Sequence, residues 1–322
     1  FQITQEYLGF SNHLVFLAPM WKECLDSDTY VQGAGSTIAR VTDGSLFPHS
    51  LTAIAGVTNI GDDINWCGHP FAQANWYAFG RLCWNTDLSA AQIAEEFLKQ
   101  TFSTDEHFVE PVRQLLLRSW DTAVSYMMPL GLHHIFAFGH HYGPEPWCAP
   151  PNTRPDWLPK YYHRADSIGI GFDRTVRGSK AVLQYHEPLA TLYGNLETCP
   201  EEYLLWFHHV PWEYVMRNGL TLWDNLCYIY NSGVEDAWEF VDFWQKARPY
   251  IDSERYERLL KRFERQAKDA EWWRDACLLY FQRYSRRSIP ADCLPPVHKL
   301  EDLMKFKLHI DNYTVADMDN LP

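Results

Sequence analysis

Residues 51–60 read LTAIAGVTNI, an apolar run that is nearly continuous and ends in the polar turn Gly61-Asp62-Asp63. Such a run is expected of a parallel strand whose two faces are both covered. The chain opens with FQITQ at residues 1–5, where apolar and polar residues alternate as they do in a strand. A helix is predicted at residues 71–82, directly after Pro70. Strand, crossover, strand and helix in this order are typical of an α/β layer or barrel.

From residue 86 onward the pattern becomes helical. Ser89 and Gln92 have the spacing of a capping box, and apolar residues on one helix face follow them. Further helices are predicted at residues 112–124, 201–209, 212–230, 233–246 and 253–285. The sequence therefore predicts an α/β domain over residues 1–85 and a mostly α-helical domain over residues 86–322.

The composition restricts the class of protein. The chain has 28 Lys and Arg against 41 Asp and Glu, a formal net charge of −13, so its surface repels phosphate backbones and nucleic acid is a poor partner. No stretch approaches the roughly 18 consecutive apolar residues of a membrane-spanning helix, so no membrane association is expected. Hydrophobic residues make up 46% of the 322 residues, enough for a sizeable buried core.

The cysteines and the start of the chain bear on its compartment. Eight cysteines lie far apart, a density too low for a disulfide scaffold, so reduced thiols and a cytoplasmic location are expected. The first residues show no basic and apolar leader that would signal export. The chain begins without Met and inside a strand-like segment, so we expect it to be the C-terminal part of a longer protein.

Carboxylates follow both predicted strands. Glu6 ends the first strand, and Asp62 and Asp63 end the second. In a parallel barrel, residues at the C-terminal ends of strands point into the site that the following loops form. Glycoside hydrolysis needs two carboxyl groups, one to protonate the leaving oxygen and one to activate water or attack directly. Carboxylates at strand ends cap turns or helices more often than they catalyse, and this interpretation stays open.

A proline-rich segment stands out at residues 143–159, with six prolines in seventeen residues. Prolines stiffen such a loop, so its aromatic side chains are held in place at little entropic cost. Trp157 in this segment is suited to contact the apolar face of a sugar. The alternative is that the segment only joins two domains.

Two pairs of histidines, His133-His134 and His140-His141, lie seven residues apart. On one helix the pairs would share faces, which suggests a metal site. Two helical turns, about 10 Å, would separate them, which is too far for one ion without other ligands. Gly131 and Gly139 also argue against a continuous helix. Hydrogen bonding to a sugar or an anion, or a structural role, is favoured over a metal site.

The chain resembles glycoside hydrolase family 67, the α-glucuronidases, through seven ordered stretches within residues 1–212. These stretches are FQITQEYLG (1–9), LAPMW (17–21), HPFAQAN (69–75), GHHYGP (139–144), YYHRAD (161–166), GIGFDRT (169–175) and WFHHVPW (206–212). Several blocks in a fixed order are far more specific than any single motif.

The resemblance implies a fold and an activity. The expected fold is α/β: the last strands of a (β/α)8 TIM barrel over residues 1–85, followed by the mostly α-helical C-terminal domain of residues 86–322. The family removes glucuronic acid, or its 4-O-methyl ether, that is α-1,2-linked to the terminal xylose of xylo-oligosaccharides, with inversion and without a cofactor. The implied partners are these aldouronic acids from glucuronoxylan and a second copy of the chain in a homodimer.

The resemblance also assigns roles to residues. Glu6, within the family's Thr-Gln-Glu-Tyr motif, is expected to be the general base that activates water. The family's general acid and a companion Asp have no matching positions here, so the chain alone is expected to be inactive. Trp157 is expected to be the aromatic residue that the C-terminal domain contributes to the substrate site. A uronate needs cationic or hydrogen-bonding groups, for which Arg154, Arg164, Arg174, His140 and His141 are the candidates, and a structural ion pair is the alternative role of each.

A non-catalytic helical carbohydrate-binding or dimerisation module is the alternative function. Such a module would bind sugar or self-associate without turnover, and no strand that supplies an acid would precede it.

Overall fold

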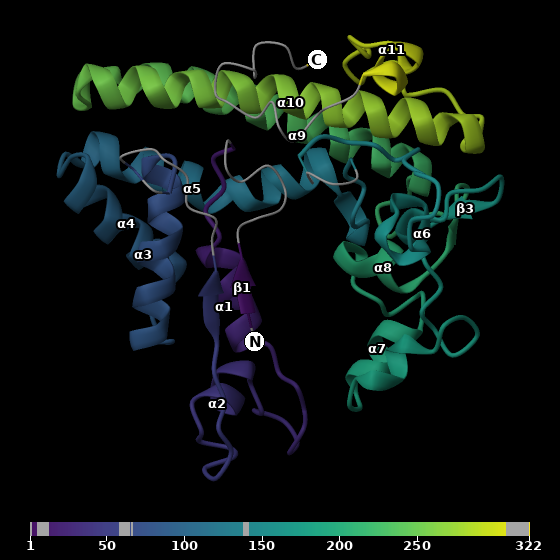
Figure 1. Cartoon of the computed structure of the whole chain (residues 1–322), viewed down its shortest axis with the longest axis horizontal. Coiled ribbons are helices and arrows are strands. Elements are labelled where there is room, and N and C mark those ends of the chain that lie inside the picture. Colours follow the sequence, from purple (N-terminus) through teal and green to yellow (C-terminus); the bar gives the residue numbers. More distant parts are fainter. Residues whose placement is uncertain (1, 5–12, 58–64, 66, 138–141, 307–321) are drawn as a thin grey trace. The chain divides into compact units, whose positions relative to one another are not determined.

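The computed structural model describes residues 2–4, 13–57, 65, 67–137, 142–306 and 322, and these residues form a mostly helical chain with four short strands (Figure 1). The strands are β1 (Gln2–Thr4), β2 (Ala55–Val57), β3 (Gly169–Ile170) and β4 (Val210–Pro211). The α-helices are α1 (Ala18–Asp26), α2 (Ile38–Thr42), α3 (Pro70–Trp84), α4 (Ala90–Thr101), α5 (Glu106–Met127), α6 (Pro159–His163), α7 (Leu189–Gly194), α8 (Leu204–Phe207), α9 (Leu222–Lys246), α10 (Ser253–Ser285) and α11 (Leu300–Lys305). The 3-10 turns are η1 (Pro129–Gly131), η2 (Pro155–Trp157), η3 (Ala181–Gln184), η4 (Glu201–Tyr203) and η5 (Arg248–Tyr250).

Several predicted helices are confirmed. α3 begins at Pro70, and α4 begins after the predicted capping box, in which Ser89 accepts from the amide of Gln92 and the Gln92 side chain accepts from the Ser89 amide. α10 spans residues 253–285, the range that the pattern predicts. Local signals of this kind, a cap and an apolar face, are sufficient to place a helix.

The predicted break between helices at residues 231–232 is wrong. α9 is continuous from Leu222 to Lys246 and contains Gly233 in its interior. A Cβ at Gly233 would lie 2.6 Å from the backbone nitrogen of Tyr126 in α5. The glycine is therefore required for two helices to approach closely, and it does not end the helix. The predicted helical start at residue 212 also lies too early, because α9 begins at Leu222.

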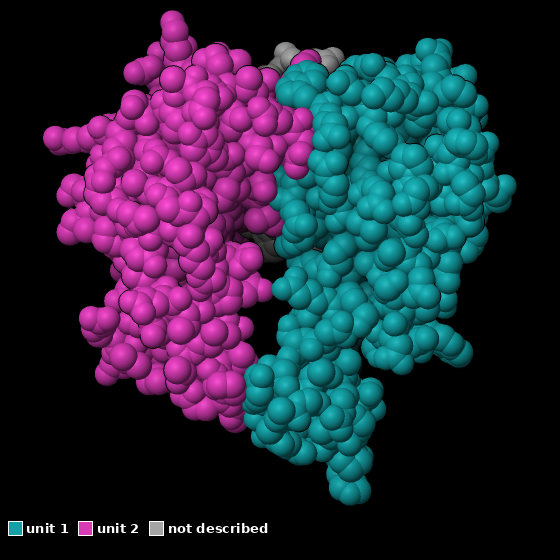
Figure 2. All heavy atoms as spheres, turned by 180° about the vertical axis from the view of Figure 1, so that it is seen from behind, with its two compact units in different colours: residues 1–123, 237–266 teal, residues 124–236, 267–322 magenta. Residues whose placement is uncertain are grey.

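The described residues group into two compact units, shown in different colours in Figure 2. The first unit contains residues 1–123 and 237–266, and the second contains residues 124–236 and 267–322. These units are groups of residues in contact, and they do not test the division into domains at residues 85–86, which stays a prediction.

In the first unit, β1 and β2 form a parallel pair in which Ile3 lies opposite Gly56. α1 and α2 lie between these strands along the chain, and α3 follows β2. This order of strand, helices, strand and helix agrees with the predicted order. A Cβ at Gly56 would lie 2.5 Å from the ring of Trp76 in α3, so α3 packs closely against this face of β2.

The expectation that residues 51–60 form a strand covered on both faces is wrong for the residues that can be checked. β2 comprises Ala55–Val57 only, none of residues 51–56 is buried, and residues 58–60 lie outside the described residues. Within the described part of the chain, β1 covers one edge of β2 and α3 covers one face. Leu51 and Ala53 therefore remain exposed.

Buried polar side chains hold an extended segment, residues 14–17, inside the first unit. The amide of Leu14 donates to Oε1 of Gln266 at 2.9 Å, and that of Leu17 donates to Oδ1 of Asn75 at 2.8 Å. Ser119 accepts from the amide of Phe16 at 2.8 Å. Because buried backbone amides need partners, these three side chains replace a neighbouring strand.

In the second unit, residues 169–174 run beside residues 205–211. β3 pairs antiparallel with β4, with Ile170 opposite Val210. The hydrogen bonds continue past the strands, since the amides of Phe172 and Arg174 donate to the carbonyl groups of residues 205 and 207 at 3.0 and 2.9 Å. This ladder fixes the positions of Phe172 and Arg174.

Among the described residues, no helix combines the length and the apolar character that crossing a bilayer demands. The eight cysteines are free thiols. The cytoplasmic location stays a prediction.

Candidate substrate-binding site

The predicted site residues fall into two groups. Five of them lie outside the described residues, so their roles stay predictions: Glu6, Asp62, Asp63, His140 and His141. Trp157 and Arg164 lie in the second unit.

Arg164 and Arg174 contact the same aromatic ring. The guanidinium carbon of Arg164 lies 3.9 Å from the centroid of the Phe172 ring, and that of Arg174 lies 4.2 Å from it. Phe172 is buried, so its ring gives both cations a fixed apolar support. Two positively charged side chains therefore contact one ring.

Arg174 is the more deeply placed of the two. Only 8% of its surface is exposed, and its guanidinium lies 3.7 Å from the ring centroid of Trp206. It donates from Nη1 to the carbonyl oxygen of Trp206. Burial is the main reason that its pKa falls to about 10, and the neighbouring Arg164 charge acts in the same direction.

Arg164 lies at the end of α6 and is exposed. Its backbone adopts the left-handed conformation (φ 44°, ψ 32°), which turns the chain away from the helix. Its Nε donates to the carbonyl oxygen of Tyr161 at 3.1 Å, and its guanidinium also lies 5.2 Å from the Tyr161 ring centroid. Contacts with these two neighbouring rings, Tyr161 and Phe172, restrict a side chain that would otherwise be mobile.

Further rings adjoin Arg174. Tyr162 and Trp206 are stacked with an interplanar angle of 23° and a centroid separation of 6.3 Å. His133 lies 5.3 Å from Trp206 and 5.7 Å from Tyr162, centroid to centroid. Desolvation lowers the pKa of His133 to about 4, with smaller contributions from His134 and Arg174. The His133 imidazole is therefore neutral at neutral pH.

The side chains described above form what we name the arginine–aromatic cluster. Its members are His133, Tyr161, Tyr162, Arg164, Phe172, Arg174 and Trp206.

Trp157 is connected to this cluster through its loop. Trp157 ends η2, is 50% exposed, and has the Arg154 guanidinium 5.0 Å from its ring centroid. Arg154 also pairs with Asp156, and this hydrogen bond and charge hold the pKa of Asp156 below its usual value. The Tyr162 hydroxyl donates to the carbonyl oxygen of Asp156 at 3.1 Å, which ties the loop to the cluster. A half-exposed indole on a loop tied to the arginine–aromatic cluster is suited to the apolar face of a sugar.

The cluster is equipped for binding rather than for acid–base catalysis. It contains two guanidinium groups and no Asp or Glu, whereas glycoside hydrolysis uses a pair of carboxyl groups. Guanidinium groups bind carboxylates or phosphates through parallel hydrogen bonds, and aromatic faces bind the apolar faces of sugars. The arrangement can therefore hold an anionic sugar, while catalytic carboxylates must come from elsewhere.

The metal alternative finds no support in the described part of the chain. There, no group of three or more His, Cys, Asp or Glu side chains has an arrangement that could hold a metal ion. His133 and His134 are surrounded by rings, with His134 4.8 Å from the Tyr162 centroid. His140 and His141 lie outside the described residues.

Sequence reasoning missed Phe172 and Trp206 as members of the site. Phe172 and Arg174 are two residues apart in an extended segment, so their side chains emerge on one side of it. The stretch GIGFDRT at residues 169–175 shows this spacing, so the sequence alone could have indicated that Phe172 accompanies Arg174. The approach of Trp206 depends on the ladder between distant segments, and no local pattern indicates it.

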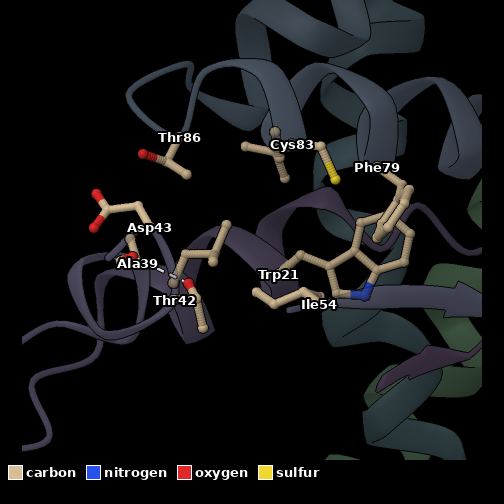
Figure 3. Close-up of a pocket in the computed structure, with 10 residues that line it drawn as sticks. Trp21, Ala39, Thr42, Asp43, Ile54, Phe79, Cys83 and Thr86 are labelled. Carbon is tan, nitrogen blue, oxygen red and sulfur yellow. Dashed lines mark hydrogen bonds between the residues drawn. The ribbon is translucent and has the colours of Figure 1, made fainter. Parts of the chain in front are cut away.

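An apolar pocket of about 180 Å³ lies in the first unit (Figure 3). Trp21 and Phe79 form part of its wall, and Asp43 is the one carboxylate among the described residues that line it (Figure 3). Hydrogen bonds from Ser45 lower the pKa of Asp43, and burial raises the pKa of the Cys83 thiol, so neither group is prepared to act as a base or a nucleophile near neutral pH. This pocket therefore does not provide the carboxylate pair for glycoside hydrolysis.

Two protein-family models match consecutive parts of the chain. The model of the glycosyl hydrolase family 67 middle domain matches residues 1–66. The model of the glycosyl hydrolase family 67 C-terminus matches residues 67–293, a range that includes every member of the arginine–aromatic cluster.

Curated relatives are similar along most of the chain. Alpha-glucuronidase A of Emericella nidulans is 38% identical over 294 residues, which is 90% of this chain and 34% of that protein. The probable alpha-glucuronidases A of Aspergillus fumigatus and Aspergillus clavatus are 36% and 35% identical over 286 residues, 88% of this chain and 34% of each protein. The chain thus spans about a third of the length of the curated relatives that it matches.

Proposed function

The chain belongs to glycoside hydrolase family 67, and we propose that it is the C-terminal part of an α-glucuronidase. The proposed reaction removes α-1,2-linked glucuronic acid, or its 4-O-methyl ether, from xylo-oligosaccharides. The match of two consecutive family models over residues 1–293 is the observation that carries the proposal. The names of the relatives, alpha-glucuronidases, support the same activity.

The proposed mechanism is hydrolysis with inversion at the anomeric carbon. Glu6 would act as the general base and remove a proton from the attacking water. A carboxylic acid that this chain does not supply would protonate the leaving xylose oxygen. Inverting enzymes hold their two carboxyl groups roughly 6.5–9.5 Å apart so that the water fits between them.

The proposed setting of Glu6 is the last part of a (β/α)8 barrel. The parallel pairing of β1 with β2, and the helices between and after them, are compatible with two neighbouring strands of such a barrel. Glu6 follows β1 by two residues, at the end where barrel sites are formed. We propose the same division as the sequence analysis, with the barrel part at residues 1–85 and a helical domain at 86–322.

The proposed substrate contacts come from the second unit. Trp157 would support the apolar face of the sugar, and Arg164 would bind the uronate, with His140 and His141 as hydrogen-bond partners. The half-exposed indole of Trp157 and the two cations at Phe172 support this assignment. A homodimer and a cytoplasmic location complete the proposal, and the molecular mass in solution tests the first of these.

The experiment is the replacement Glu6→Gln in the full-length protein, assayed with a 4-O-methylglucuronosyl xylo-oligosaccharide. Loss of the base should lower kcat by about 10²–10⁴-fold, the usual contribution of a general base. Proton NMR of the first sugar released should show the β-anomer. Glu257→Gln, at an exposed position of α10, serves as the matched control and should keep normal activity. Retention of more than half the activity by Glu6→Gln would contradict the proposal.

A further inference from the structure

The pocket drawn in Figure 3 has the properties of a docking surface. Its volume is about 180 Å³, and α1, α2 and α3 all contribute to its walls. The apolar residues that line it are Trp21, Leu25, Ala39, Ile54, Phe79 and Leu82. A cavity of roughly 150 Å³ accepts benzene, so this pocket is large enough for one aromatic or branched apolar side chain.

Large apolar side chains that lie close to this pocket in the sequence are exposed. Trp84 ends α3, between the lining residues Cys83 and Thr86, and is 87% exposed. Leu51 precedes the lining residue Ile54 by three positions and is fully exposed. Single exposed apolar residues are ordinary, whereas large ones beside an apolar pocket indicate a surface that a partner covers.

The strand pair of the first unit also requires further elements. In the described part of the chain, β1 and β2 form a parallel sheet of two strands with three residues each. Parallel strands occur almost only in larger sheets whose two faces are covered, and two strands alone are marginally stable at best. Further strands or helices from outside the described residues are therefore needed to complete this unit.

Under the proposed function, the remainder of the same polypeptide is best placed to supply these elements. The chain spans about a third of the length of its curated relatives, so most of their length lies outside the match. A segment joined covalently to the start of this chain is held near β1 at high effective concentration, whereas a second copy must first associate. Elements that extend the strand pair also approach the helices that flank it, and these helices form the walls of the pocket.

We propose that the pocket and Trp84 form the surface on which the preceding part of the full-length polypeptide packs, with an apolar side chain of that part inserted between α1, α2 and α3. Filling the pocket and covering the indole remove apolar surface from water, which is the main driving force for such packing. The inference rests on the proposed function only in taking this chain as the C-terminal part of a longer enzyme.

Cys83 provides a reporter at the pocket. It lines the pocket and is exposed, whereas six of the other cysteines are buried and Cys24 is half-buried (Figure 3). Labelling of the native protein with iodoacetamide, followed by peptide mass spectrometry, gives the reaction rate of this thiol. The rate in the full-length protein should be at least about tenfold below that in the 322-residue chain, because the reaction then requires local opening of the packed surface.

Two variants of the full-length protein test the packing itself. Trp84→Ser removes an exposed indole, so it should leave folding of the 322-residue chain undisturbed, and it should raise Cys83 labelling in the full-length protein by about tenfold. Ala39→Arg places a charge in the pocket and should raise the labelling to the rate of the 322-residue chain. Circular dichroism verifies the fold of both variants.

The matched control is Trp238→Ser, which removes an exposed indole of α9 in the same unit. Trp238 is not among the residues that line the pocket, so this variant should leave Cys83 labelling unchanged.

Three results would overturn the proposal. The first is an equal labelling rate of Cys83 in the full-length protein and in the 322-residue chain. The second is protection of Cys83 in the isolated chain that increases with chain concentration, because a second copy would then cover the pocket. The third is unchanged labelling in full-length proteins that carry Trp84→Ser or Ala39→Arg.

Failure here is distinguishable from failure of the proposed function. Thiol labelling needs no turnover, and the Glu6→Gln assay changes no residue of the pocket. A full-length protein that loses activity in Glu6→Gln, but reacts at Cys83 as fast as the 322-residue chain, would keep the proposed function and remove this inference.

Discussion

His163 and Pro146 are joined by a hydrogen bond of 2.9 Å, in which Nε2 of the buried imidazole donates to the proline carbonyl oxygen. The other ring nitrogen, Nδ1, accepts from the amide of Ala165 at 2.9 Å. Both ring positions are therefore used by the neutral tautomer, and a second proton on Nδ1 would face an N–H group. Desolvation is the largest reason that the pKa of His163 falls to about 4.

This histidine predicts loss of stability in mild acid. The unfolded chain takes up a proton at His163 near pH 6.5, whereas the folded chain resists it until about pH 4. The free energy of unfolding is therefore intact above pH 6.5 and decreases as the pH falls to about 4, by up to about 3 kcal/mol from this residue. Urea unfolding at pH 7, 5.5 and 4.5 measures how steeply the free energy of unfolding decreases with pH.

The control for this slope is an exposed histidine. His186→Gln should leave the pH dependence of unfolding unchanged, since the His186 side chain is exposed. His163→Gln should be less stable at pH 7 and should show a shallower decrease toward pH 4.5. An unchanged slope in His163→Gln would contradict the assignment.

A single methyl group added at Gly171 is expected to lower the free energy of unfolding strongly. Its φ is +104°, and a Cβ there would lie 2.2 Å from the carbonyl oxygen of His208. Gly219 has a φ of +84° but no neighbour within 4 Å of an added Cβ. Gly219→Ala should therefore lose only the roughly 1–2 kcal/mol of the left-handed conformation. Gly171→Ala should lose clearly more, because the clash is with backbone, and equal losses by chemical denaturation would refute this explanation.

Removing the charge of the buried carboxylate Asp275 is expected to destabilise the protein far more than removing that of an exposed carboxylate. Its side chain is fully buried, pairs with Arg274, and accepts from the amides of Val297 and His298 at 2.8 and 3.0 Å. Asp275→Asn should destabilise the protein by about 3–5 kcal/mol, because it leaves the Arg274 charge buried and unpaired.

The matched exposed carboxylate is Asp26, which pairs with Lys22 on the surface of α1. Asp26→Asn should change the free energy of unfolding by less than about 1 kcal/mol. Limited proteolysis should cut near residues 297–298 in Asp275→Asn and leave Asp26→Asn intact. Resistance of Asp275→Asn to both urea and protease would show that the buried pair does not hold this segment.

Elements that depend on contacts between residues close in the sequence could be predicted, and elements that depend on contacts between distant residues could not. Ser89 and Gln92 specify the start of α4 within four residues, so a local pattern was sufficient. Gly233 has the local character of a helix breaker, yet its role is set by Tyr126 more than one hundred residues away. Leu51 belongs to an apolar run that predicts burial, yet Leu51 is exposed in the structure. In both cases the outcome depends on which distant segments pack against the residue, and the sequence around the residue does not show this.

The site follows the same rule. Trp157 was predicted from a stiff loop and from the family resemblance, and Arg164 from the cation that a uronate needs. Arg164 belongs to the arginine–aromatic cluster, and Trp157 lies in the loop that adjoins it. The meeting of Arg164 with Arg174 requires Phe172, whose position depends on hydrogen bonds to residue 205. Long-range backbone pairing of this kind has no local signature, so the shared ring could not be derived from the sequence.

Trp157 predicts an effect on binding without an effect on folding. Half of its surface is exposed, so Trp157→Ala should keep the wild-type free energy of unfolding within about 1 kcal/mol. Its affinity for a 4-O-methylglucuronosyl xylotriose should fall by about tenfold, because the indole offers its face to the sugar ring. Trp84→Ala, at a more exposed indole in the first unit, is the control and should bind like the wild type. Calorimetry on the two variants decides the matter: equal affinities would mean that Trp157 serves only to pack its loop against Arg154.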